Sequence, residues 1–333
     1  MSRRLGIDVG GTKCLGVVVD DGIDDDDDIV AETREPTPHD ADELVDVLDR
    51  ITGVLTAEAG AVASVGVGAP GLITIDGVLR SSPNVPDVVD LDVAGRLGAL
   101  LGRPVTVAND ATCAALAEWK VGAGQGHDDI VMVTLGTGIG GGVVAGGRLL
   151  VGHNGFAGEF GHMVVDPNGP PCPCGRRGCW ERYASGSGLG QLARAAAVGG
   201  RLRRVVQVAG GDVSHVRGEH VQAAAEEGDA AAVAVIDEFA RWVALGLVNL
   251  TNVFDPAVFV LGGGLAEGAH LYLEPIQRWF GELLYAPDRR LHPELCFAAL
   301  GEHAGAIGAA LLPTTRPAAP TSPAQAVSDS LGT

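Results

Sequence analysis

Two short apolar runs joined by a glycine turn open the chain. Residues 5–9 and 15–19 flank Gly10-Gly11-Thr12-Lys13, which predicts a β-hairpin with a tight turn. A third strand is expected near Ile29, after an acidic run at residues 24–28. We interpret that run as a solvated loop, because adjacent aspartates lack the alternate spacing of a calcium-binding loop.

Apolar residues spaced by three or four positions predict two long helices. The first begins at Asp40 or Asp42 and the second near Asp229, since a carboxylate at a helix start accepts from free N–H groups. The apolar stripe of the first helix is Leu44, Val47, Leu48, Ile51 and Leu55. The stripe of the second is Val233, Ile236, Ala240, Val243, Leu247 and Leu250.

Continuous apolar runs predict buried strands between and after these helices. We expect strands at 63–69 and 105–108, with a helix following the second strand as far as about Lys120. The stretch 146–187 is rich in Gly, Pro and Cys and is expected to be irregular. A strand at 258–261 and a last helix at 302–312 come after it.

The hairpin unit occurs twice. Residues 7–12, IDVGGT, lead into the apolar run 17–19, and residues 133–138, VTLGTG, lead into 143–145. The match is weak in identity, but it has the form of a duplicated unit. Two such hairpins facing one another would form two cups lined by backbone.

Composition and charge limit the function classes. With 333 residues and 46% apolar residues, the chain is long enough for about two globular domains. Its net charge of −19 and pI near 4.7 argue against sequence-independent binding to nucleic acid or to an anionic membrane. No apolar run is long enough for a membrane span, and the N-terminal sequence lacks a signal-peptide pattern. We therefore expect a cytoplasmic protein.

Three glycine-rich turns follow strands. Gly10 and Gly11 lie beside Asp8 and Thr12, and the second turn is Gly136-Thr137-Gly138. Such turns allow backbone N–H groups to crowd against phosphate oxygens, and a nearby carboxylate can hold the accompanying Mg²⁺. The third string, Gly262-Gly263-Gly264, is suited to an adenine ring lying against backbone. Each turn alone is also compatible with an ordinary tight turn.

Asn109-Asp110 ends one predicted strand and begins a helix. One interpretation is a helix cap, because Asn and Asp are favoured there. The other is a general base that accepts a proton from a substrate hydroxyl, which phosphoryl transfer requires. Spacing alone leaves both interpretations open.

The strongest constellation is a His/Cys cluster. His162, Cys172, Cys174 and Cys179 lie within 18 residues and can supply the four ligands of a structural zinc. The alternatives are three reduced surface thiols, or water in place of His162 as the fourth ligand. Glu159 and Glu181 flank the cluster, and carboxylates are suited to binding the paired hydroxyls of a polyol.

Together these motifs resemble the ROK family of sugar kinases over about residues 4 to 312. The matching strings are IDVGGTK at 7–13, GVGAPG at 66–71, SPN at 82–84, ANDA at 108–111, TLGTGIGGG at 134–142, GEFGH at 158–162, CPCGRRGCWERYASG at 172–186 and VLGGG at 260–264. The His plus CxC-x4-C-x-E arrangement is specific to that family, whereas any single glycine turn is not. One departure is Thr112 where the family often has Asn after Asn-Asp-Ala.

The resemblance implies an actin-like ATPase (ribonuclease H-like) fold, with two α/β domains around a cleft and a zinc loop. The first domain would span 1–115 and be completed by the helix 302–312. The second would span 116–301 with the zinc loop at 158–186, and 313–333 would be a disordered tail. Family members are usually homodimers or homotetramers.

The resemblance also implies the chemistry: transfer of the ATP γ-phosphate to the 6-hydroxyl of glucose, with Asp110 as the base. Sugar-binding residues would be Asn84, Asn109, Asp110, Glu159, His162 and Glu181. Residues for ATP and Mg²⁺ would be Asp8, Gly10, Gly11, Thr12, Lys13, Gly136, Thr137, Gly138, Gly263 and Gly264. Another hexose, such as N-acetylmannosamine, fructose or mannose, is the main alternative. A sugar-sensing repressor is a lesser one, because repressors of the family carry a DNA-binding domain ahead of the first strand.

Overall fold

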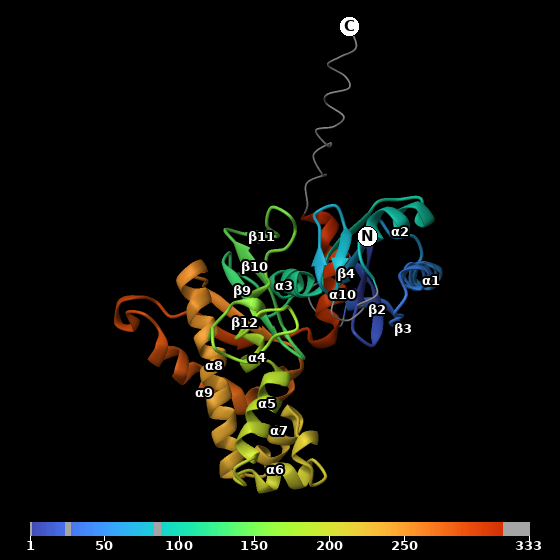
Figure 1. Cartoon of the computed structure of the whole chain (residues 1–333). Coiled ribbons are helices and arrows are strands. Elements are labelled where there is room, and N and C mark those ends of the chain that lie inside the picture. Colours follow the sequence, from blue (N-terminus) through green and yellow to red (C-terminus); the bar gives the residue numbers. More distant parts are fainter. Residues whose placement is uncertain (1, 24–27, 83–87, 316–333) are drawn as a thin grey trace.

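The computed structural model describes residues 2–23, 28–82 and 88–315, and its first five-stranded sheet contains the N-terminal hairpin (Figure 1). The strand order is β3-β2-β1-β4-β8. The central strand, β1, pairs antiparallel with β2 and parallel with β4. The strands are β1 (Arg3–Val9), β2 (Lys13–Asp20), β3 (Ile29–Pro36), β4 (Ser64–Ala69) and β8 (Val105–Asn109).

A second five-stranded sheet repeats this topology. Its order is β11-β10-β9-β12-β13, again with two antiparallel pairings followed by two parallel ones. The strands are β9 (Ile130–Leu135), β10 (Ile139–Ala145), β11 (Arg148–Leu150), β12 (Val258–Gly262) and β13 (Glu294–Phe297). The internal repeat predicted from the sequence is therefore present in the strand topology. A third, small sheet contains β5 (Leu72–Ile73), β6 (Val78–Ser81) and β7 (Leu91–Asp92).

Four helices pack around the first sheet. They are α1 (Ala41–Ala59), α2 (Val93–Leu101), α3 (Asp110–Val121) and α10 (Ala304–Leu311). Asp40 caps α1 by accepting from the N–H groups of Asp42 and Glu43. Helix α10 lies against β1 and β4 so closely that a Cβ on Gly6 would stand 2.0 Å from the Ala306 carbonyl oxygen. The C-terminal helix thus completes the core of the N-terminal sheet (Figure 1).

The second sheet is flanked by a helical region at 181–283. The helices are α4 (Glu181–Ala184), α5 (Gly186–Ala197), α6 (Arg203–Val208), α7 (Gly218–Glu226), α8 (Ala230–Phe254) and α9 (Ala269–Leu283). The prediction that Val233 belongs to the buried stripe of α8 is wrong. Val233 is 49% exposed, whereas its neighbour Ala232 is buried. The helix starts at Asp229, whose side chain accepts from the Ala232 N–H, and this first turn directs position 233 to solvent.

The stretch 146–187 is less irregular than expected, since it contains β11, α4 and the start of α5. Short 3-10 turns occur there and elsewhere: η2 (Phe160–His162), η3 (Val213–His215), η4 (Gly264–Gly268), η5 (Pro287–Arg289), η6 (Gly301–His303) and η7 (Leu312–Thr314). Pro313 and Thr314 therefore belong to an ordered turn. The acidic run at 24–27 and the predicted tail from 316 on lie outside the described residues.

The chain crosses between the two sheets twice, and one buried carboxylate contacts both crossings. Glu118, near the end of α3, has no exposed surface. It accepts from the N–H groups of Ala123 at 2.8 Å, Ala299 at 3.1 Å and Leu300 at 2.9 Å. A charge that is this deeply buried is stable only when hydrogen bonds replace its lost water. Glu118 thus fixes the path from α3 to β9 relative to the path from β13 to α10.

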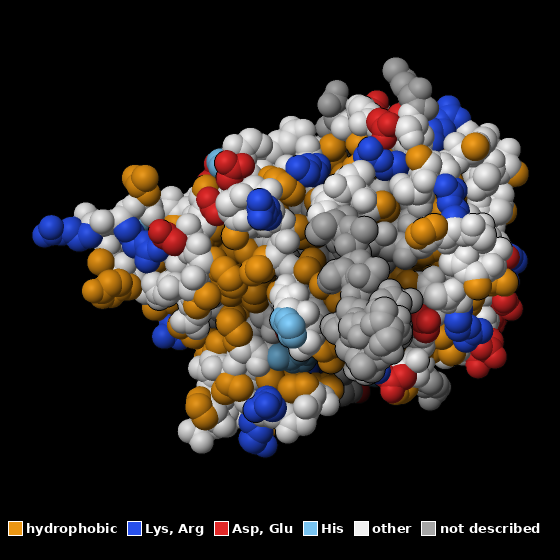
Figure 2. All heavy atoms as spheres, turned by 90° about the horizontal axis from the view of Figure 1, so that it is seen from above, with side chains coloured by type: hydrophobic (Ala, Val, Ile, Leu, Met, Phe, Trp, Pro, Cys, Tyr) orange, Lys and Arg blue, Asp and Glu red, His pale blue; other side chains and the backbone are white. Residues whose placement is uncertain are grey.

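On the face shown in Figure 2, Lys and Arg side chains stand singly or in small groups between acidic and apolar ones. Within the described ranges, no helix is long and apolar enough to cross a membrane.

Candidate active site

A cavity of about 460 Å³ lies where the turns of the two sheets approach each other. Its lining combines the first glycine turn, the third glycine string and the strand-to-helix junction after β8. The predicted site residues in it are Asp8, Gly10, Thr12, Lys13, Asp110, Gly262, Gly263 and Gly264. Residues far apart in the sequence are thus brought together in one cavity by the repeated sheet topology.

Asp8, near the end of β1, is the most unusual acid in this cavity. Its Oδ1 atom is buried and has no hydrogen-bond partner among the described residues. Burial raises the pKa of Asp8 to about 7; the charge of Asp110 adds to this rise and the charge of Lys13 opposes it. Helix α10 approaches so closely that a Cβ on Gly305 would lie 2.6 Å from the Asp8 Cγ atom. An unpartnered carboxylate oxygen beside an incoming phosphate is a suitable ligand for a divalent cation.

Asp110 is the first residue of α3, and the preceding residue, Asn109, caps the helix. Asn109 Oδ1 accepts from the Thr112 N–H at 3.1 Å, and its amide donates to the Gly71 carbonyl at 3.2 Å. Asp110 accepts a local bond from the Ala111 N–H at 2.8 Å. Burial raises the pKa of the Asp110 carboxyl, with hydrogen bonds opposing that rise. The two sequence interpretations therefore divide between two residues: Asn109 caps the helix, and Asp110 faces the cavity. The cap uses the backbone of Thr112, so the departure from Asn at 112 leaves it intact.

Lys13 has a partner that the sequence did not suggest. Its ammonium pairs with Glu302, which also accepts from Arg34 at 2.7 Å. Glu302, Gly301 and Gly305 all line the same cavity. The glycines at 301, 305 and 308 are spaced by three or four positions, and that spacing was an available signal that this helix approaches another element closely.

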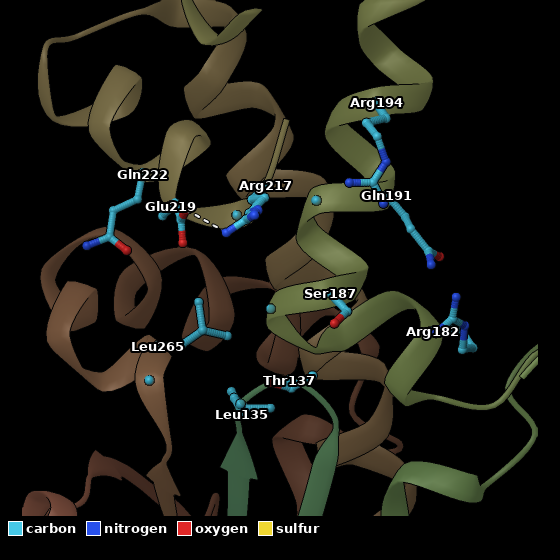
Figure 3. A pocket seen from close by; sticks show the side chains of 15 residues that line it. Leu135, Thr137, Arg182, Ser187, Gln191, Arg194, Arg217, Glu219, Gln222 and Leu265 are labelled. Carbon is cyan, nitrogen blue, oxygen red and sulfur yellow. Dashed lines mark ion pairs between the residues drawn. The ribbon is translucent and has the colours of Figure 1, made fainter. Parts of the chain in front are cut away.

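A second, larger pocket of about 760 Å³ adjoins the first at Gly264, which lines both. It is drawn in Figure 3. Gly136 and Thr137 of the β9–β10 turn line it, as do the first residues of α5 and α7. The turn is fixed to α5 by the Gly186 N–H, which donates to the Gly136 carbonyl at 2.8 Å. Gly11 and Gly138 belong to the two turns but line neither pocket.

The four residues of the His/Cys cluster come together. One ligand atom from each of His162, Cys172, Cys174 and Cys179 lies within 4.8 Å of every other. A tetrahedral zinc with bonds of about 2.0–2.3 Å separates its ligand atoms by roughly 3.3–3.8 Å, and the Sγ atoms of Cys174 and Cys179 are already 3.5 Å apart. The donor set and its spacing fit a closed tetrahedral metal site.

The acids beside the cluster converge on His162. Its Nε2 lies 3.9 Å from Glu159 Oε2, and its Nδ1 lies 3.8 Å from Glu181 Oε1. Glu181 also accepts from the Cys172 thiol at 3.0 Å. Burial raises the pKa of Glu159; His162 opposes this, and Asp110 and Glu181 add to it. The pKa of Glu159 thus depends on His162 and Glu181 at the cluster and on the candidate base Asp110. Asn84, the remaining predicted sugar ligand, lies outside the described residues.

Comparison with known proteins identifies the family. The ROK family model matches residues 4–316, so the chain belongs to the ROK family. It is 37% identical over 314 residues to the glucokinase of Streptomyces coelicolor, covering 93% of this chain and 97% of that protein. It is 34% identical over 314 residues to the N-acetylmannosamine kinase of Escherichia coli, covering 92% and 97% respectively.

Among solved structures, a ROK family glucokinase from Streptomyces griseus in complex with glucose and AMPPNP matches with a TM-score of 0.81. That protein is 38% identical, and the match covers 93% of this chain and 99% of that one. With the repeated sheet topology, this confirms the predicted actin-like ATPase fold.

Proposed function

We propose that this protein is an ATP-dependent glucokinase, which transfers the γ-phosphate of ATP to the 6-hydroxyl of glucose. The observation that carries the proposal is the shared cavity, in which Asp110 lies with Asp8 and with glycines of both sheets. Phosphoryl transfer needs positioning, neutralisation of charge and a base for the hydroxyl, and this cavity has a residue for each. The glucokinase relatives support glucose as the acceptor.

Asp110 acts as the base. Its raised pKa reflects a buried carboxylate that gains by accepting a proton, and Asn109 fixes the start of α3 beneath it. Glu159, His162 and Glu181 bind the remaining hydroxyls, with Asn84 and Asn109 completing the set. Each carboxylate can accept from two adjacent O–H groups.

The glycine turns hold the donor. Gly10, Gly11 and Thr12 from one side and Gly136, Thr137 and Gly138 from the other present N–H and hydroxyl groups to the phosphates. Lys13 neutralises phosphate charge, and Gly263 and Gly264 border the adenosine. Asp8 would hold the Mg²⁺ that accompanies ATP, and this cation would supply charge stabilisation during phosphoryl transfer.

The His/Cys cluster would hold a structural zinc. The ligands would be His162, Cys172, Cys174 and Cys179, and a closed site of this kind orders a loop without taking part in the chemistry. The loop carries Glu159 and Glu181, so its order sets the geometry of the sugar site. Free cysteines are typical of a reducing compartment, which supports a cytoplasmic location.

The same proposal includes the division into domains and assembly into a homodimer or homotetramer. Residues 1–115 with 302–312 would close against 116–301 over the cavity. Tyr285 and Leu291, on the arm between α9 and β13, are 77% and 94% exposed, and burying them would favour association. Light scattering on the purified protein measures the assembly.

The test of function is ADP release with Mg·ATP across glucose, mannose, fructose, N-acetylglucosamine and N-acetylmannosamine. We expect glucose to give the highest kcat/KM. The relative that acts as an N-acetylmannosamine kinase favours that sugar as the second candidate. If another sugar gives the highest kcat/KM, only the acceptor changes. If no sugar is turned over by metal-loaded protein, the kinase proposal is wrong.

A further inference from the structure

Three arginines line the larger pocket (Figure 3), and two of them have partners among the described residues. Arg194 donates to the Val216 carbonyl at 2.5 Å. Arg217 lies 3.6 Å from Glu219 Oε1. Arg182 makes no side-chain hydrogen bond or ion pair within the described part of the chain, and its Nε atom is buried without a partner. Arg194 therefore makes a structural hydrogen bond, and Arg217 makes an exposed ion pair. Arg182 has no such partner in the part of the chain that the structure describes.

Arg182 lies at the junction of the two halves of the site. The preceding residue, Glu181, accepts from the Cys172 thiol of the His/Cys cluster at 3.0 Å, and its Oε2 atom would lie 2.8 Å from a Cβ on Gly138. Arg182 itself faces the other pocket, together with Thr137 and Ser187 (Figure 3). The short helix α4 thus directs one acid toward the His/Cys cluster and one base toward the pocket beyond the β9–β10 turn.

A buried guanidinium N–H without an acceptor is unfavourable, because the group has lost water without replacing it. In a chain with a net charge of −19 an internal carboxylate partner would be easy to supply, yet none within the described ranges pairs with Arg182. The two Nη groups are not among the buried unpartnered atoms, and they are the donors that an anion in the pocket can reach. The N-termini of α5 and α7, at Gly186 and Gly218, line the same pocket and make its potential more positive.

We propose that Arg182 binds the phosphate chain of the nucleotide donor, so that α4 contacts both substrates. This rests on the proposed kinase function and adds a residue to it. The planar guanidinium can donate two parallel N–H bonds to one phosphate group. Arg182 therefore distinguishes donors by their phosphates and not by their base or sugar.

The test is direct nucleotide binding to the zinc-loaded protein by calorimetry, using adenosine, AMP, ADP and ATP with Mg²⁺. Hydrogen bonds to charged groups are worth about 10- to 100-fold in affinity, and we expect Arg182→Gln to weaken ATP by that factor. Adenosine should bind within about twofold of wild type, and the step in the phosphate series at which the loss appears identifies the group contacted. In steady state, KM for ATP should rise while KM for glucose stays within about twofold.

Arg201→Gln is the matched control, because it removes the same charge from an exposed position outside the His/Cys loop and lines neither pocket. It should leave all four affinities unchanged. Arg182→Lys should recover part of the ATP affinity. Equal losses for adenosine and ATP, or no loss for either, would overturn the proposal, as would a wild-type protein that binds no nucleotide. A protein that binds ATP but phosphorylates no sugar would refute the kinase function while this binding series still decides the role of Arg182.

Discussion

The two sheets share one strand order but differ in the residues that succeed their last strands. After β8, the last parallel strand of the first sheet, the chain continues directly into α3 with Asn109 and Asp110. After β13, the corresponding strand, it continues with Ala298 and Ala299 before α10. The equivalent helices α3 and α10 pack so tightly that a Cβ on Gly308 would lie 1.7 Å from the Cys113 carbonyl oxygen.

The insertions differ as well. Between β3 and α1 there are only a few residues, whereas the chain between β11 and α8 contains the His/Cys cluster and α4 to α7. A repeated framework therefore places two glycine turns opposite each other, while the proposed base lies in one half and the proposed sugar-binding acids lie in the insertion of the other. The two halves thus share a strand order but do not carry equivalent candidate site residues.

The largest effect should come from the base that only the first half carries. Asp110→Asn keeps the size of the side chain and the start of α3 but cannot accept the proton, so kcat should fall by about 10²–10⁴-fold. The affinity for glucose, measured by calorimetry, should change little. Asp42→Asn, at an 81% exposed side chain on α1, serves as the control. A kcat within a few-fold of wild type for Asp110→Asn would exclude this assignment.

The insertion that only the second half carries should depend on the proposed zinc. Cys174→Ser, or chelation, should release the loop bearing Glu159 and Glu181 and so lower Tm and raise KM for glucose together. KM for ATP should rise as well, because the released loop also carries Arg182, although the glycine turns that contact ATP lie on the sheets and stay in place. Elemental analysis of the purified protein should give about one zinc per chain. A Cys296→Ser variant, outside the cluster, is the matched control; no zinc in wild-type protein would refute the ligand assignment.

Asp8 and Thr134, its counterpart in the second sheet, should contribute differently to the pH dependence of the free energy of unfolding. Asp8 is aligned with Gly68 of β4 as Thr134 is with Gly262 of β12. Because the folded pKa of Asp8, about 7, is above its ordinary value, the free energy of unfolding falls as pH rises from about 4 to about 7. Asp8→Asn should remove this fall and be more stable than wild type above pH 7, by up to roughly 4 kcal/mol.

Urea denaturation at several pH values measures that difference. Thr134→Val should follow the wild-type pH dependence, since no titratable group is lost. A stability difference between Asp8→Asn and wild type that is the same at pH 5 and pH 8 would contradict the buried-carboxylate interpretation.

The smallest effects should separate two glycines of one turn. A Cβ on Gly138 would lie 2.8 Å from Glu181 Oε2, whereas one on Gly136 would meet nothing within 4 Å. Gly138→Ala should displace the Glu181 carboxylate and raise KM for glucose by several-fold, a cost of about 1 kcal/mol. Gly136→Ala should lie within about 0.5 kcal/mol of wild type in stability. Similar kinetics for the two variants would mean that Glu181 does not contribute to sugar binding.

Much of the framework could be predicted from the sequence because its signals are local. The strands around Asp8 and Thr134 are continuous apolar runs that end in glycine turns, and both are predicted correctly. The three short strands of the small sheet are not predicted, since Val78–Ser81 has two exposed polar residues and no apolar alternation. The helices α2, α6 and α7 are too short for the long stripes that define α1 and α8. Helix α9 does have such a stripe, with Tyr272, Ile276 and Phe280 buried, and was not predicted.

The site divides in the same way. Asp110 and the cysteines follow strands or glycines at recognisable spacings, so the sequence alone suggests their roles. Glu118, Arg182 and Gly305 owe theirs to tertiary packing. In the sequence, Glu118 and Arg182 look like exposed helix positions. The structure shows that Glu118 is enclosed by the segments that cross between the sheets. It also shows that, among the described residues, Arg182 is unpaired beside the larger pocket. Close approaches between distant segments leave no local signal beyond a glycine.

The seating of α10 against β1 and β4 has a consequence for biosynthesis. The strand β4 ends at residue 69, and α10 begins at residue 304. At a synthesis rate of about 5–20 residues per second, the first sheet waits roughly 10–50 s for the helix that covers it. During that time apolar strand faces around Gly6 and Gly66 are open to the ribosome exit and to chaperones. The first part of the protein to be made is thus among the last to reach its native packing.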